Sequence, residues 1–150
     1  MKTPGTVKAA AVCWAVAIAA GVTETGLVVT ELAMDDAFDA GVWTAIGLRS
    51  IVYTVAAALV VFFTLGRRWA RTALTALLSV VGLAAMVVPA AMELASGADF
   101  ADAFGSGGEL ADPFLAVRLL HIAAVVVATA AMFTPGANAY FAGRRELQRS

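Results

Sequence analysis

The stretch that decides the fold is residues 113–134, PFLAVRLLHIAAVVVATAAMFT, in which Arg118 and His121 are the only ionisable side chains. A helix needs about 20 apolar residues to cross the hydrocarbon core of a bilayer. Three more stretches meet this requirement, at residues 9–30, 42–65 and 72–95. None alternates between apolar and polar residues as a barrel strand does, and only helices or closed barrels satisfy the backbone in lipid. The sequence therefore predicts an all-α membrane protein, a four-transmembrane-helix bundle that forms a single membrane domain over residues 1–150.

The composition of the whole chain supports this prediction. Hydrophobic residues make up 61% of the 150 residues and charged residues 14%, against about 45–50% and about 25% in soluble globular proteins. The formal net charge of −1 gives no field that would recruit nucleic acid. A single cysteine, Cys13, excludes an intramolecular disulfide and a cysteine-rich metal site. We therefore expect the lipid bilayer as a partner, no nucleic acid and no cofactor.

Basic residues gather in three segments that a four-span topology places on one side of the membrane. The two intervening connections, the acidic loops 31–41 and 96–112, contain no Lys or Arg. Because cytoplasmic loops carry an excess of Lys and Arg, we expect both termini in the cytoplasm and the chain in the cytoplasmic membrane. The three segments are the N-terminus, the connection 66–71 and the basic tail 135–150, and they hold eight of the ten basic residues: Lys2, Lys8, Arg67, Arg68, Arg71, Arg144, Arg145 and Arg149.

The N-terminal segment has a second interpretation. Two lysines followed by an apolar run and the sequence Ala17-Ile18-Ala19 resemble a secretory signal peptide with its cleavage site. The apolar pattern resumes at residues 26–29 and completes a full span, so we expect an uncleaved membrane helix.

Aromatic residues near the ends of the spans are expected to anchor the protein at the membrane interfaces, where amphipathic rings accumulate. One set lies beside the acidic loops and the other beside the basic segments. They are Trp43 and Phe114 in the first set, and Phe62, Phe63, Trp69, Phe133 and Tyr140 in the second.

Each span contains one charged residue: Glu24, Arg49, Glu93 and Arg118. At 1.5 Å per helical residue, all four lie about 5–10 Å from the acidic-loop ends of their spans. Two acids and two bases at similar depth could neutralise one another. Glu24 precedes Arg49 by 25 residues, and Glu93 precedes Arg118 by 25 residues. This equal spacing suggests a duplicated two-helix hairpin, which is a hypothesis.

Three interpretations of these four charges remain open. The first is structural, with buried ion pairs that fix which helices are neighbours in a non-enzymatic accessory or structural protein. The second is an oligomeric, proton-coupled small-molecule transporter that uses Glu24 or Glu93 as its titrating acid. The third is a site that binds a lipid headgroup or a small anion through Arg49 and Arg118. No constellation of residues suited to nucleophilic, metal or phosphate chemistry is present, so we expect no enzyme.

His121 and Tyr53 extend the predicted polar cluster. His121 follows Arg118 by three residues and Tyr53 follows Arg49 by four, so each shares a helix face with an arginine. We expect His121 to be a hydrogen-bonded core residue with Tyr53 as its partner, rather than a haem ligand. Alanine-rich faces on the first and fourth spans would also allow close helix packing, so a homo-oligomer or an unknown membrane protein partner stays open.

Two short motifs, GRRWAR at residues 66–71 and PGANAYF at residues 135–141, resemble a set of small four-span integral membrane proteins of actinobacteria. This resemblance implies four spans with both termini in the cytoplasm, and it implies no site residues. Residues 17–22, AIAAGV, are also similar to the first helix of small multidrug exporters of the Emr type, which carries an essential glutamate. Here Gly21 stands in the place of that acid and Glu24 follows three residues later, so the sequence departs from the exporter pattern.

Overall fold

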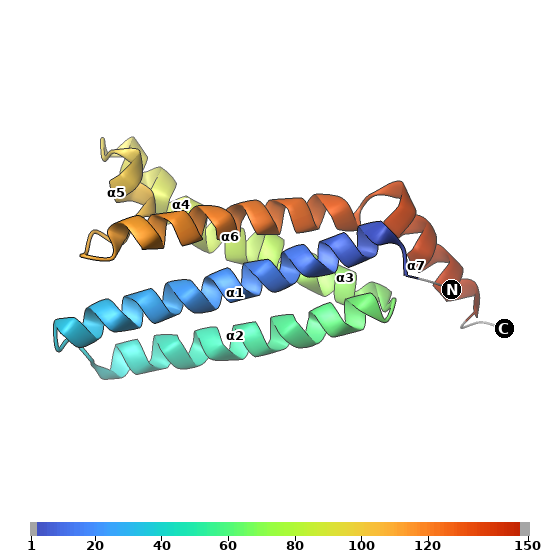
Figure 1. Cartoon of the computed structure of the whole chain (residues 1–150), viewed down its shortest axis with the longest axis horizontal. Coiled ribbons are helices and arrows are strands. Elements are labelled where there is room, and N and C mark those ends of the chain that lie inside the picture. Colours follow the sequence, from blue (N-terminus) through green and yellow to red (C-terminus); the bar gives the residue numbers. More distant parts are fainter. Residues whose placement is uncertain (1–2, 148–150) are drawn as a thin grey trace.

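The computed structural model describes residues 3–147, with side chains as far as Gly143, and within this range the chain is helical and forms no strand (Figure 1). Four helical stretches are long and apolar enough to cross a membrane, which confirms the predicted fold class. They are Gly5–Met34 (α1), Ala40–Thr64 (α2), Arg68–Ala95 and Ala111–Met132 (α6). Lys2 and Arg149 lie outside the described residues, and the side chains of Arg144 and Arg145 lie outside the described side chains.

The third span consists of three consecutive helical segments. It begins as an α-helix at Arg68–Leu74 (α3), widens to a π-helix at Thr75–Gly82 (η1) and returns to an α-helix at Leu83–Ala95 (α4). Phe100–Phe104 (α5) is a short helix in the long connection that follows. The start of α1, the turn between α2 and α3, and the helix α7 lie at one end of the bundle, here called the terminus end (Figure 1). The acidic connections lie at the opposite end, here called the loop end.

Two connections show how the sequence ends one helix and begins the next. Asp39 caps α2, because its Oδ1 accepts a hydrogen bond from the Val42 amide at 2.8 Å. Gly66 ends the same helix with a φ of 79°, a left-handed conformation that favours glycine. The amides of Gly66 and Arg67 donate to the carbonyls of Phe63 and Phe62 at 2.9 and 3.0 Å. The glycine of the GRRWAR motif therefore makes the tight turn that joins the second and third spans.

The hydrophobic core lies mainly in the terminus half of the bundle. Helix α1 is central, and it packs most extensively against α6 and next against α2. The largest fully buried side chains are Trp14, Tyr140, Phe63, Phe141, Leu74 and Met132, and they come from all four spans and from α7. Towards the loop end, α4 and α5 diverge from α2, and the extensive contacts of α4 are with its chain neighbours η1 and α5 (Figure 1). The bundle is therefore closed at the terminus end and splayed at the loop end.

The predicted tail contains a further helix, Pro135–Leu147 (α7), which packs across the terminus end (Figure 1). Pro135 occupies the first position of α7, where its missing N–H costs no hydrogen bond. Arg71 of the third span contacts α7, since its Nη2 donates to Asn138 Oδ1 at 2.7 Å and its guanidinium lies 5.5 Å from the ring centroid of Phe141. Tyr140 donates its hydroxyl to the carbonyl of Thr64 at 3.2 Å.

The prediction of interfacial aromatic anchors is correct for some residues and wrong for others. Trp43, Phe62, Trp69 and Phe133 are exposed on the bundle surface, as expected of anchors. Phe63, Phe114 and Tyr140 are buried instead. Phe63 and Tyr140 are covered because α7 folds back onto the bundle and brings Phe141 within ring contact of both. Phe114 lies beneath the guanidinium of Arg118, 4.5 Å from its ring centroid.

Candidate functional site

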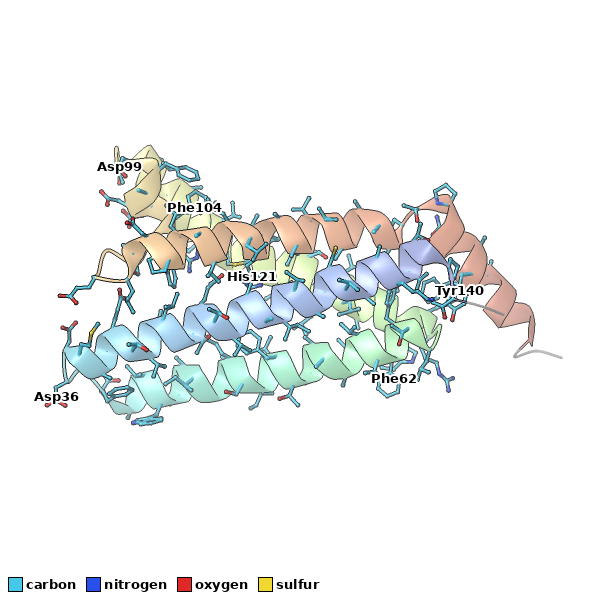
Figure 2. All side chains as sticks on the ribbon, viewed as in Figure 1. Asp36, Phe62, Asp99, Phe104, His121 and Tyr140 are labelled. Atoms are coloured by element: carbon cyan, nitrogen blue, oxygen red, sulfur yellow. The ribbon has the colours of Figure 1, made fainter. Side chains whose placement is uncertain are left out.

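Glu24 is the one buried charged residue among the described side chains, and its carboxylate is paired by two residues of α6. His121 Nδ1 lies 2.9 Å from Oε1, and Arg118 Nε lies 3.7 Å from Oε2. The Glu24 side chain is 9% exposed, and those of Arg118 and His121 are 20% and 14% exposed. Because Arg118 and His121 are three residues apart on one helix, a single face of α6 presents both groups to Glu24 of α1. Figure 2 shows His121 between α6 and α1. We call Glu24, Arg118 and His121 the α1–α6 cluster.

Hydrogen-bond chemistry sets the proton positions in this cluster. An ionised carboxylate can only accept, so His121 donates from Nδ1 when Glu24 is charged. Arg118 Nε is buried and has no hydrogen-bond partner, so its contact with Glu24 at 3.7 Å is electrostatic. Its guanidinium also lies over the ring of Phe114, an arrangement that favours a cation. The cluster thus pairs the Glu24 carboxylate with the permanent cation Arg118 and with the imidazole of His121.

Tyr53 lies beside this cluster but does not bond to His121, so that prediction is wrong. The Tyr53 hydroxyl donates to the carbonyl of Gly21 at 2.7 Å, and it lies 3.0 Å from the hydroxyl of Thr25. The reason is the absence of a side chain at Gly21, which lets α2 approach the backbone of α1. A Cβ atom at this position would lie 2.9 Å from Tyr53 Cε1 and 3.1 Å from His121 Cε1. Gly21 is therefore the residue on which the three helices converge.

The prediction that all four charges gather in one buried cluster is wrong for Arg49 and Glu93. Both side chains are exposed, and neither forms an ion pair with any of the described residues. Glu93 is carried outward by α4, which diverges from the other spans at the loop end (Figure 1). Arg49 lies on the side of α2 that faces η1 and α4. The proposed hairpin repeat remains a hypothesis. The ion pairs do not show a twofold pattern, because Glu24 pairs with Arg118 while Arg49 and Glu93 do not pair.

Two cavities are lined by residues of the α1–α6 cluster, and another adjoins one of them at Arg49. The first, here called the lateral cavity, has a volume of about 260 Å³ and lies between α2, η1–α4 and α6. Its polar lining residues are Glu24, Arg49, Tyr53, Arg118 and His121, and the remainder are apolar apart from Gly82. The second, here called the upper groove, has about 210 Å³ and runs between α1 and α2 from Arg49 to Leu32 and Val42.

The third cavity is a vestibule of about 660 Å³ at the loop end, with Arg118 among its lining residues. Glu31 holds the glycine-rich loop 105–110 over it, because its Oε1 accepts hydrogen bonds from the Leu110 amide at 2.9 Å and the Ser106 hydroxyl at 3.1 Å. The loop approaches this carboxylate closely at Gly108, where a Cβ atom would overlap it. Sequence reasoning missed Glu31, which looked like one acid among several in a solvated loop. Arg118 lines both the vestibule and the lateral cavity, so its side chain lies between the two spaces.

Among residues 3–147, no group of three or more His, Cys, Asp or Glu side chains is placed to hold a metal ion. Comparison of the chain with protein-family models, curated proteins and solved structures found no match, so the fold and the side-chain geometry are the basis for any functional conclusion.

Proposed function

We propose that the chain is a non-catalytic structural or accessory component of the cytoplasmic membrane, in which the α1–α6 cluster locks the first and fourth spans together. The observation that carries this proposal is the pairing of both carboxylate oxygens of the buried Glu24 within the chain. An acid in a membrane span is costly unless it is paired. Removing one partner of a buried pair leaves an uncompensated charge, at a cost of about 3–5 kcal/mol. The pair therefore favours packing of α6 against α1, because any arrangement that separates these two helices leaves Glu24 unpaired.

The proposed orientation has the terminus end in the cytoplasm. The support comes from the distribution of charge, since the described basic residues of this end include Lys8, Arg67, Arg68 and Arg71, while the loop end carries acids. Anionic headgroups on the cytoplasmic face attract basic segments of this kind.

A double-mutant cycle tests the structural role. We expect Glu24→Gln and Arg118→Gln each to lower the free energy of unfolding by several kcal/mol, and the double variant to lose clearly less than the sum, because no charge is then left unpaired. The charge-exchanged variant, with Arg at position 24 and Glu at position 118, should recover part of the loss. Glu93→Gln is the matched control, because Glu93 is an exposed acid in a span, and it should change stability by less than about 0.5 kcal/mol.

Unfolding of the full chain in detergent micelles, followed by circular dichroism, measures these differences. The proposal fails if Glu24→Gln is as stable as the Glu93→Gln control, or if the two single losses add fully in the double variant.

A proton-coupled transporter, working as an oligomer, is the second candidate. The observation that favours it is that Glu24 lines the lateral cavity while its partner Arg118 lines both this cavity and the vestibule. The titrating acid would be Glu24, since Glu93 lines none of the three cavities. In proteoliposomes with an imposed pH gradient, a transporter would acidify or alkalinise the lumen when the protein is present. Glu24→Gln would abolish that flux while the helical circular dichroism signal stays unchanged, whereas a structural cluster gives no flux in the parent protein.

A further inference from the structure

Arg49 is a permanent cation placed deep in a membrane span without an acceptor from the rest of the described chain. It lies nine residues into α2, or about 14 Å along the helix, and α2 has 25 residues. Its guanidinium carries five N–H donors, and in hydrocarbon every donor left unpaired is costly. A group of this kind within a span usually faces a functional cavity and finds its partner there.

The other charged groups of the lateral cavity have partners within the chain, although Arg118 Nε contacts Glu24 at 3.7 Å without a hydrogen bond. The Glu24 carboxylate pairs with Arg118 and His121, and the Tyr53 hydroxyl donates a hydrogen bond to the Gly21 carbonyl. With His121 neutral, the charges of Glu24, Arg49 and Arg118 sum to +1 in the lining. The space therefore has an excess positive charge, and Arg49 is the group that carries it.

The side chains that line the two cavities next to Arg49 are mostly apolar. Below it, the lateral cavity is bounded by apolar side chains of the third and fourth spans, including Leu78, Val81 and Met86. Above it, the upper groove leads between α1 and α2 towards the loop end, and its lining is apolar except for Thr25 and Arg49 itself. A volume of about 260 Å³ is slightly below the range of about 300–1,000 Å³ typical of ligand pockets, so it fits a segment of a hydrocarbon chain.

We propose that the lateral cavity binds an anionic membrane phospholipid, with the phosphate held by Arg49 in the upper groove and one acyl chain against η1 and α4. The chain enters sideways from the bilayer between α2 and η1–α4, whose residues line the cavity. Figure 1 shows α4 diverging from α2 towards the loop end. Two features favour a lipid over a soluble anion. The acidic loops at this end repel anions that approach from water, and an apolar wall contributes binding only to a ligand that has a chain. This inference is independent of the structural role proposed for the α1–α6 cluster, which Arg49 does not join.

Lipid retention by the full-length protein tests the site. The protein is purified in detergent and titrated with phosphatidylglycerol or with phosphatidylcholine of the same acyl chains, and bound lipid is counted by native mass spectrometry. Both lipids carry the phosphate that Arg49 would bind, but the choline ammonium of phosphatidylcholine neutralises the headgroup and places a second cation near Arg49. We therefore expect the parent protein to bind the anionic lipid about tenfold more tightly, which corresponds to about 1.4 kcal/mol. Arg49→Gln should abolish this preference. Arg67→Gln, which removes an exposed arginine from the turn at the terminus end, is the matched control and should keep it.

A second variant tests the cavity without changing its charge. Gly82 lines the lateral cavity, and a Cβ atom there would meet only the Leu77 carbonyl oxygen, at an ordinary contact distance of 3.5 Å. Gly82→Leu should therefore fill the space reserved for the acyl chain and lower retention of both lipids, while Arg49 remains in place.

Four outcomes would overturn the proposal. The first is equal binding of the two lipids by the parent protein, and the second is unchanged anionic preference in Arg49→Gln. The third is stabilisation of the protein by inorganic phosphate alone to the same extent as by the lipid, which would identify a soluble anion as the ligand. The fourth is a dimer that Arg49→Gln and Glu93→Gln both dissociate, which would identify the exposed acid of a second copy as the partner of Arg49.

Discussion

The substitution Gly21→Ala probes the point at which α1, α2 and α6 converge. The new Cβ would lie 2.9 Å from Tyr53 Cε1, and 3.1 Å from both His121 Cε1 and the Tyr53 hydroxyl oxygen, whereas ordinary contacts begin at 3.4 Å. The Tyr53 ring cannot move aside freely, because its hydroxyl donates to the Gly21 carbonyl at 2.7 Å. Overpacking of this kind costs about 1–3 kcal/mol, and weakening the hydrogen bond costs about 1 kcal/mol more. The higher helix propensity of alanine offsets about 1 kcal/mol, which leaves a net loss of about 1–3 kcal/mol.

The matched control for this substitution is Gly26→Ala in the same helix, where a Cβ atom would meet nothing within 4 Å. We expect this variant to be unchanged or up to about 1 kcal/mol more stable than the parent. Thermal unfolding of both variants in the same detergent gives the comparison. Tyr53→Ala should remove the overlap, so Gly21→Ala should cost less in that background than in the parent. Equal stability of Gly21→Ala and Gly26→Ala would refute the close convergence of the three helices at Gly21.

Two further predictions concern α7 and the topology. Arg71→Met removes the hydrogen bond to Asn138 and the cation–π contact with Phe141, both of which lie in α7, so we expect α7 to detach more often. Trypsin should then cut the chain within α7, at Arg144 or Arg145, faster than it cuts the parent. The topology is tested with Ala37→Cys in a background whose native cysteine is replaced by serine. This cysteine should react with a membrane-impermeant maleimide in intact cells, since Ala37 is exposed at the loop end. Reaction only after the membrane is broken would show that the loop end faces the cytoplasm, contrary to the proposed orientation.

The sequence was sufficient to predict the four spans because their signal is composition over about 20 residues, and this signal does not depend on neighbours. It also indicated that Glu24 and Arg118 lie at similar depth, and the structure pairs them. Similar depth does not determine which helices touch, however. Helices that are apolar on all sides leave their rotation and their neighbours undetermined, which is why Arg49 and Glu93 were wrongly placed in the cluster.

The sequence of α7 contains a helix signal that is compatible with two structures. Pro135-Gly136 follows the predicted fourth span as a helix stop would, and proline is equally suited to the first position of a new helix. Ala137, Tyr140 and Phe141 follow at the spacing of a single helix face, and all three are buried. An interfacial tail and a packed helix share this spacing, and the choice between them depends on tertiary contacts such as that of Arg71 with Asn138.

The splayed loop end gives the protein a tapered outline within the bilayer. The core is tight at one end, whereas α4 stands away from α2 at the other, so the two leaflets must accommodate unequal cross-sections (Figure 1). Lipids adjust to the shape of an embedded protein at a modest energetic cost, and that cost depends on local thickness and composition. Bilayer curvature and lateral pressure therefore act unequally on the two ends of this bundle. Pressure in the loop-end leaflet acts chiefly on α4, whose extensive contacts are with its chain neighbours η1 and α5.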